Sequence, residues 1–185
     1  MKLVTIQSKK ILQPLITNKI HIADFYYIFD KIEEDSSVFG DVYQFIMWHY
    51  GYKQPPIFCC VVGRLANFQF TKNCDSMILL ELDVPDKLVS LQSFDGWDDI
   101  IWYMDKPSRY TKDIPFDEYV ESILNGLNVE KEDTVVQATI PCIDLNWVQN
   151  VYEVDKSFMD LFDGKVCIED ISTYDLKLIN FKELL

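Results

Sequence analysis

The pattern of hydrophobic and polar positions divides the chain into short strands and a few amphipathic helices. Alternating or continuous apolar runs predict strands at residues 3–7, 57–62, 77–82, 134–142 and 148–154. Apolar positions at helical spacing predict helices at residues 23–33, 38–50 and 115–125, and a short one near 11–16 that Pro14 limits. This order predicts an α+β fold in a single domain, residues 1–185, in which an N-terminal strand and helices precede a mainly antiparallel sheet.

The stretch that follows the strand at residues 77–82 holds the most distinctive residues. A short apolar run, Leu88–Leu91, leads to Asp95, Gly96 and Trp97, and then to an aromatic segment. We expect a turn at Asp95, with Trp97 packed at the edge of the core. Asp98 and Asp99 fit the first turn of a helix, where negative charge is stabilising, better than they fit a Mg²⁺ or Ca²⁺ site.

Charge is strongly negative and unevenly distributed. The net charge is −13, and the first 22 residues hold four lysines and no acid, so the remaining residues carry −17. Such a charge repels nucleic acid and anionic lipid and attracts a basic protein surface. Solubility alone also explains the charge, and the sequence leaves both interpretations open.

Compartment and thiol state follow from what the sequence lacks. No apolar run approaches the roughly 20 residues of a membrane span, and the first residues do not resemble a signal peptide, so we expect a cytoplasmic protein. An odd number of cysteines then predicts free thiols, and their apolar context predicts burial for most of them. The five cysteines are Cys59, Cys60, Cys74, Cys142 and Cys167.

Residues that could carry catalysis are scarce. The chain has two histidines, His21 and His49, and no C-x-x-C pair, which argues against a zinc site. It has no G-x-S-x-G motif and no glycine-rich loop. We therefore predict no metal and no cofactor. The four tryptophans, without an accompanying basic groove, are interpreted as core or cleft walls: Trp48, Trp97, Trp102 and Trp147.

Four segments together resemble a bacterial family of uncharacterised proteins, domain-of-unknown-function family 3841. They are MKLVTIQ at the start, Trp48 with the later Pro56-Ile57-Phe58, LELDVPDKLVSLQSFDGWDDII, and VVQATIPCIDLNWVQNVYEV. The chain departs from the family pattern at Asp98, where relatives carry histidine, and at Cys59-Cys60, where they carry aromatic residues. The resemblance implies no established activity.

A weaker likeness links the chain to the ADP-ribosyltransferase fold. The opening LVTIQSKKILQPL resembles the first strand and helix of those enzymes, and Gln137-Ala138-Thr139 stands where a late strand supplies their catalytic glutamate. Thr139 is not an acid, and the first strand has no Arg or His, so Gln7 is its nearest polar candidate. The likeness implies an ADP-ribosyltransferase-like fold in which the catalytic activity of those enzymes is altered or lost.

Two functions therefore remain open. The first is a cytosolic protein that binds a basic protein partner, such as a nucleic-acid-binding protein, as an inhibitor, anti-defence or immunity protein does. The second is a nucleotide- or NAD-handling enzyme with the ADP-ribosyltransferase-like fold, active or inactive. The sequence leaves the oligomeric state open, and it predicts no direct contact with nucleic acid or membrane. The predicted binding residues are Gln7, Asp95, Trp97, Asp98, Asp99 and Tyr103.

Overall fold

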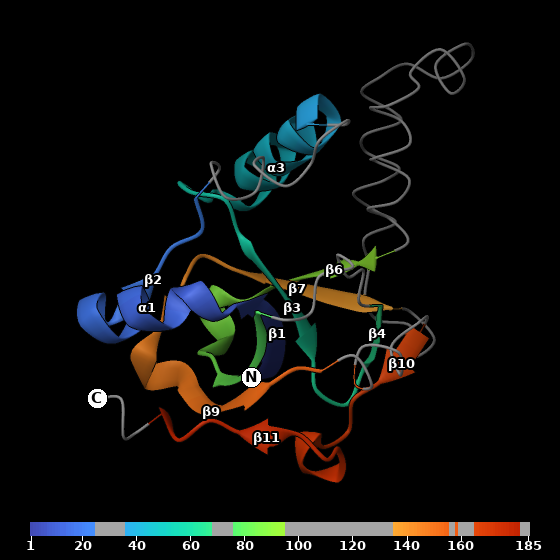
Figure 1. The fold of residues 1–185 in the computed structure, drawn as a ribbon. Coiled ribbons are helices and arrows are strands. Elements are labelled where there is room, and N and C mark those ends of the chain that lie inside the picture. Colours follow the sequence, from blue (N-terminus) through green and yellow to red (C-terminus); the bar gives the residue numbers. More distant parts are fainter. Residues whose placement is uncertain (25–35, 68–75, 95–134, 156–157, 159–164, 182–185) are drawn as a thin grey trace.

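A seven-stranded sheet organises the chain (Figure 1). The computed structural model describes residues 1–24, 36–67, 76–94, 135–155, 158 and 165–181. Neighbours in the sheet follow the order β11-β9-β5-β1-β3-β7-β6, and every pair is antiparallel. The sheet strands are β1 (Lys2–Ser8), β3 (Ile57–Val61), β5 (Met77–Asp83), β6 (Ser90–Ser93), β7 (Val136–Ile140), β9 (Val148–Glu153) and β11 (Lys177–Leu178).

Two small ribbons and a few helices complete the described part of the chain. The ribbons pair β2 (Ile20–His21) with β8 (Ile143–Asp144) and β4 (Leu65–Asn67) with β10 (Lys165–Cys167). The α-helices are α1 (Leu12–Asn18) and α3 (Ser36–Tyr50). Short 3₁₀ turns are η1 (Lys9–Ile11), η2 (Asp86–Leu88), η3 (Leu145–Trp147) and η4 (Ile171–Thr173). This architecture confirms the predicted α+β fold with a mainly antiparallel sheet.

Most described elements lie where the apolar pattern placed them. The strands predicted at residues 3–7, 57–62, 77–82 and 148–154 correspond to β1, β3, β5 and β9. In the short apolar run Leu88–Leu91, Leu88 ends η2 and strand β6 begins at Ser90. Pro85 precedes η2, and the Val89 amide donates to the backbone carbonyl of Asp86 at 3.0 Å. The chain therefore turns at η2 before it extends into β6. The helix expected at 115–125 lies outside the described residues, as does nearly all of the one expected at 23–33.

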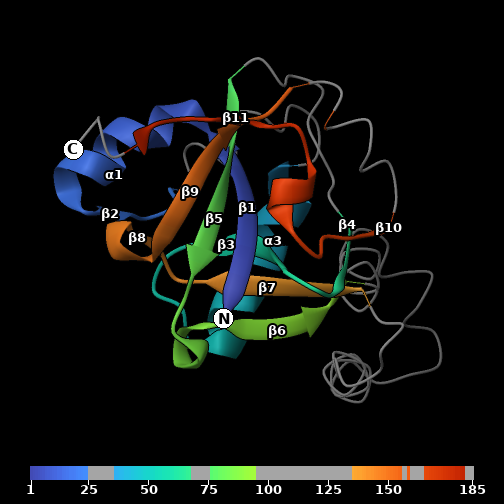
Figure 2. The same ribbon diagram turned by 90° about the horizontal axis from the view of Figure 1, so that it is seen from below.

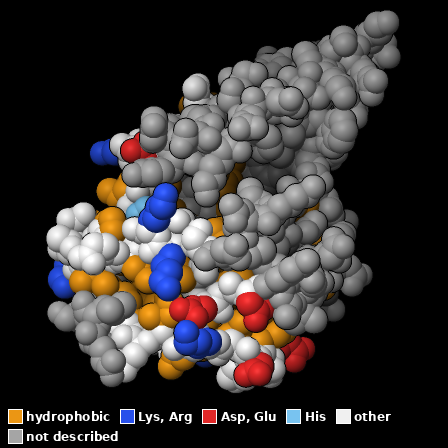
Figure 3. All heavy atoms as spheres, viewed as in Figure 1, with side chains coloured by type: hydrophobic (Ala, Val, Ile, Leu, Met, Phe, Trp, Pro, Cys, Tyr) orange, Lys and Arg blue, Asp and Glu red, His pale blue; other side chains and the backbone are white. Residues whose placement is uncertain are grey.

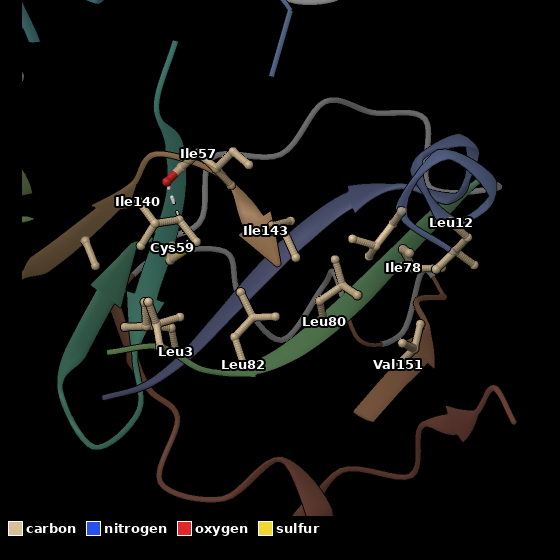
Figure 4. Close-up of a cluster of buried hydrophobic side chains, with 13 residues drawn as sticks. Leu3, Leu12, Ile57, Cys59, Ile78, Leu80, Leu82, Ile140, Ile143 and Val151 are labelled. Carbon is tan, nitrogen blue, oxygen red and sulfur yellow. Dashed lines mark hydrogen bonds between the residues drawn. The ribbon is translucent and has the colours of Figure 1, made fainter. Parts of the chain in front are cut away.

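Helix α1 and the main hydrophobic cluster cover one face of the sheet. This face, which we call the α1 face, carries Leu3, Ile57 and Leu80 (Figure 4). Leu12 and Leu15 of α1 pack into the same cluster. Burying a leucine side chain contributes roughly 1.5–3 kcal/mol, which explains why a seven-residue helix containing Pro14 holds its place.

The other face, which we call the α3 face, carries a second cluster. It includes Val4, Cys60 and Leu79 from the strands, with Phe158 and Ile171 from the C-terminal part. On the same face, the Phe58 and Tyr43 rings meet edge to face with centroids 5.5 Å apart, so α3 contacts the sheet here. The sheet is twisted, because β9, β5 and β1 run in one direction and β7 and β6 run across it (Figure 2).

Three further findings bear on the earlier expectations. Asp144 caps η3 by accepting from the Asn146 amide at 2.8 Å, which confirms the turn expected there. Strand β4 pairs with β10, about a hundred positions later in the chain. No helix in the described part of the chain is long and apolar enough to cross a membrane.

Candidate functional site

Five of the six predicted binding residues lie outside the described residues. They are Asp95, Trp97, Asp98, Asp99 and Tyr103. What the structure does place is the point from which their segment departs. The Phe94 amide donates to the Val135 carbonyl at 2.9 Å, so the residues before and after segment 95–134 are hydrogen-bonded neighbours. Segment 95–134 therefore departs from the end of the β6–β7 pair and returns to the same end.

Gln7 is the predicted site residue that the structure describes. It lies near the end of β1, half-buried, and its Nε2 donates to Thr5 Oγ1 at 2.9 Å. Thr5 is buried and in turn donates to the Phe58 carbonyl at 2.8 Å. Gln7 thus takes part in a relay that links β1 to β3 on the α1 face. Its role in binding stays a prediction.

An amide pair joins β6 to β7 on the α3 face. Gln92 and Gln137 are opposite in register, and Gln92 Nε2 donates to Gln137 Oε1 at 3.2 Å. Gln92 is fully buried, whereas Gln137 is half-buried. Among the described residues, Gln92 Oε1 is a buried oxygen without a hydrogen-bond partner, which is uncommon in folded proteins. Sequence reasoning missed Gln92, although a glutamine in the buried strand Ser90–Ser93 was a signal.

A tyrosine just beyond α3 is tied to the same pair of strands. The Tyr52 hydroxyl lies 3.0 Å from Ser90 Oγ, 3.0 Å from the Thr139 carbonyl and 3.1 Å from Thr139 Oγ1. The Tyr50 hydroxyl donates to the Leu91 carbonyl at 3.5 Å. Burial raises the pKa of Tyr50 to about 12, so this hydroxyl keeps its proton near neutral pH. These contacts fasten the C-terminal end of α3 to β6 and β7.

Helix α3 ends in a motif that fixes the direction of its last turn. Gly51 has a φ of 71°, a left-handed conformation in which a side chain would be strained. The Tyr52 amide donates to the Met47 carbonyl at 2.8 Å, which is the six-to-one bond of a Schellman motif. The helix predicted at residues 38–50 therefore ends at Tyr50, as expected. With both Gly51 and Tyr52 held, the side chains of the last turn have defined positions.

The last two turns of α3 present an aromatic surface, which we call the α3 aromatic surface: Phe45, Trp48 and His49. Trp48 is 72% exposed, so its interpretation as a core or cleft wall was wrong. The centroid of the Phe45 ring lies 5.9 Å from that of Trp48. Phe45 is also stacked on His49, with centroids 6.1 Å apart and 3° between the planes of Phe45 and His49. Burial lowers the pKa of His49, which favours its neutral form. Ile46, on another side of the helix, is buried and turns Trp48 outward.

Some charged side chains in the described part form ion pairs on the surface. Glu153 accepts from Lys177 at 2.7 Å and from Lys9 at 3.4 Å, and the hydrogen bond from Lys177 is the main reason its pKa is lowered. Figure 3 shows such opposite charges together over β9 and β11. No group of three metal-ligating side chains occurs among the residues that the structure describes.

The described cysteines are free thiols of two kinds. Cys59 and Cys60 are buried, as expected, and burial raises the pKa of Cys59 to about 12 and that of Cys60 further. Cys142 is half-buried and Cys167 is exposed. Cys74 lies outside the described residues.

Comparison with known proteins identifies one family. A family model described as Domain of unknown function (DUF3841) matches residues 2–174, which is nearly the whole chain. No curated protein matches the chain. No solved structure matches it either. The likeness to the ADP-ribosyltransferase fold is therefore without support from these comparisons.

Proposed function

The chain belongs to the DUF3841 family, and we propose that it acts by binding a basic protein partner. The observation that carries this proposal is Trp48, a tryptophan with 72% of its surface exposed on a helix end that is itself rigidly held. Single exposed apolar residues are common, but an exposed tryptophan is unusual, and tryptophan is enriched among the residues that dominate binding energy at interfaces.

The α3 aromatic surface is already organised for contact. Its rings touch one another, the Schellman motif fixes the helix end, and Tyr52 fastens it to β6 and β7. A surface held in this way loses little conformational entropy when a partner binds. Rigid aromatic side chains with few rotatable bonds are suited to that use.

Charge supports a basic partner rather than a neutral one. The chain carries −13 overall, which accelerates and favours encounters with positively charged proteins. The exposed face of an indole also attracts a lysine or arginine head, worth about 0.5–2 kcal/mol depending on desolvation. Long-range electrostatic attraction by the negative charge and short-range cation–π contact with the indole thus both favour a positively charged partner.

Sequence order links the predicted binding residues to β6, the strand that Tyr52 contacts. Strand β6 runs from Ser90, which Tyr52 contacts, to Ser93, and the segment with its acidic and aromatic residues departs after Phe94. The predicted binding residues Asp95 and Trp97 follow directly in the sequence. An acidic protein that covers a basic, nucleic-acid-binding surface would act as an inhibitor or immunity protein, and this is the class we propose.

The second function, nucleotide or NAD handling, is retained as the alternative. The observation that favours it is the unpartnered amide oxygen of Gln92. Addition of NAD should raise the melting temperature if this alternative is right and leave it unchanged if it is not.

The proposal is tested by panning a phage-displayed random peptide library on the immobilised protein. We expect enrichment of peptides rich in arginine and lysine. Trp48→Ala should lose this enrichment, while Leu178→Ala should keep it, because Leu178 is also exposed but lies in β11 at the opposite edge of the sheet. Both variants should melt close to the parent, since exposed substitutions usually change stability by less than about 0.5 kcal/mol.

Two outcomes would contradict the proposal. One is enrichment of peptides without basic residues. The other is equal enrichment on Trp48→Ala and on the parent protein.

A further inference from the structure

Two rows of uncharged side chains cross β3, β7 and β6 on the α3 face. The register places one member from each strand in each row. The first, which we call the amide row, is Cys60, Gln137 and Gln92; the second, the hydroxyl row, is Phe58, Thr139 and Ser90. Since residues two apart along a strand point to the same face, the rows lie side by side.

The amide row lies between two covering layers. The hydroxyl row is contacted by Tyr43 of α3 and by Tyr52, which follows α3. On the other side, Cys60 belongs to the hydrophobic cluster of the α3 face. Within the row, Gln137 is half-buried, so solvent reaches the pair from that side.

The two amides leave one acceptor atom, Gln92 Oε1, and one donor atom, Gln137 Nε2, outside their mutual hydrogen bond. Their single bond runs from Gln92 Nε2 to Gln137 Oε1 at 3.2 Å. Gln92 Oε1 has no partner although Gln92 is fully buried. No hydrogen bond within the described part of the chain engages Gln137 Nε2. A free carbonyl oxygen and a free amide N–H₂ therefore stand on neighbouring side chains, and a buried free carbonyl is unfavourable unless a donor meets it.

We propose that the amide row binds the amide edge of a small, neutral, planar ligand. An N–H of the ligand donates to Gln92 Oε1, and Gln137 Nε2 donates to the adjacent ligand carbonyl. Nucleobase lactams and primary carboxamides share this edge, because both place N–H and C=O side by side. Neither row contains a charged side chain, so a neutral ligand fits better than an ionised one. This site is independent of the basic partner proposed above.

The test uses uracil and nicotinamide as probes in saturation-transfer NMR with the full chain. Their controls are 1,3-dimethyluracil and N,N-diethylnicotinamide, which keep the ring and carbonyl but lack the amide N–H. We expect a signal from at least one of the two probes and at least a roughly fivefold smaller signal from its alkylated control, because the control cannot donate to Gln92. A uracil signal alone identifies a nucleobase ligand, and a nicotinamide signal alone identifies a carboxamide ligand.

Two variants tie the signal to the amide row. Gln92→Met removes the buried acceptor, and Gln137→Met, at a half-buried position, removes the donor. Either should abolish the signal, whereas Gln149→Met, at an exposed glutamine on β9, should keep it. Equal signals from probe and alkylated control would overturn the proposal. So would no signal from either probe, or a high-resolution crystal structure grown with both probes that shows only a water molecule at Gln92 Oε1.

Discussion

Replacing Gln92 with methionine should stabilise the ligand-free protein. Methionine matches the length and flexibility of glutamine, so the change removes polar atoms without opening a cavity. Gln92 is fully buried, and its Oε1 meets no donor. Such an orphaned buried group costs about 1–3 kcal/mol, and the substitution removes that cost.

The substitution also removes one hydrogen bond, and this loss of stability is smaller than the gain. Gln92→Met also removes the 3.2 Å bond to Gln137 Oε1. Gln137 is half-buried, so water can replace the lost donor, and the loss is about 0.5–1 kcal/mol. The expected net gain in the free energy of unfolding is therefore about 0–2.5 kcal/mol, with a central value of about 1 kcal/mol, which corresponds to a rise of roughly 2–4 °C in melting temperature for a chain of this size.

Urea denaturation followed by circular dichroism measures this change. The midpoint should rise while the slope m stays constant, because the surface exposed on unfolding hardly changes. Gln149→Met, at an exposed glutamine on β9, is the matched control and should change stability by less than about 0.5 kcal/mol. Gln137→Met should instead lower the free energy of unfolding by about 1–3 kcal/mol, because it leaves the buried Gln92 Nε2 without its acceptor. A loss of more than about 1 kcal/mol in Gln92→Met would show that Oε1 has a donor in the ligand-free protein, and the argument for a vacant acceptor would fail.

Three further outcomes are expected. Tyr52→Phe should lower the free energy of unfolding by about 1–2 kcal/mol in urea melts, because its hydroxyl makes three contacts with β6 and β7; no change would show that these bonds do not anchor α3. In the native protein, Cys167 should react quickly with a thiol reagent and Cys59 slowly, since Cys167 is exposed and burial raises the pKa of Cys59 to about 12; mass spectrometry showing equal rates would contradict this. Burial lowers the pKa of His21 and of His49, so below about pH 6.5 the folded protein binds fewer protons than the unfolded chain, and the free energy of unfolding should fall as the pH drops. Replacing both histidines with glutamine should flatten this part of the curve of stability against pH. An unchanged curve would refute the role given to these histidines.

Much of the fold could be predicted because its strands carry a clear apolar pattern. The run Met77–Leu82 predicted β5, which pairs with β1 over seven residues. The stop at Gly51 was also readable, since only glycine adopts a φ of 71° without strain. Fold class and these elements follow from local physics.

Strand partners and exposure could not be predicted in the same way. Pairing of β4 with β10 joins residues about a hundred positions apart, and no local pattern records it. Trp48 was interpreted as a core or cleft wall because no basic groove accompanies the tryptophans in the sequence. Its exposure depends on which side of α3 faces the sheet, and that is set by contacts such as Tyr43 with Phe58.

The candidate site was only partly within reach of the sequence. Gln92 and Gln137 are 45 positions apart, and only the β6–β7 register brings them opposite one another. The predicted residues Asp95 to Tyr103 were chosen for acidic and aromatic character, and the structure places only the strand end from which they follow. Their contribution to binding stays a prediction.

The salt dependence of affinity for a selected arginine- and lysine-rich peptide tests the central claim most directly. We expect the dissociation constant of the parent protein to rise at least roughly tenfold between low and moderate salt, because screening weakens attraction to a chain of net charge −13. Trp48→Ala should weaken binding by about tenfold or more at every salt concentration, since exposed tryptophans that anchor interfaces usually cost over about 1 kcal/mol when truncated. A dissociation constant that is indifferent to salt and unchanged by Trp48→Ala would contradict binding of a basic partner through the α3 aromatic surface.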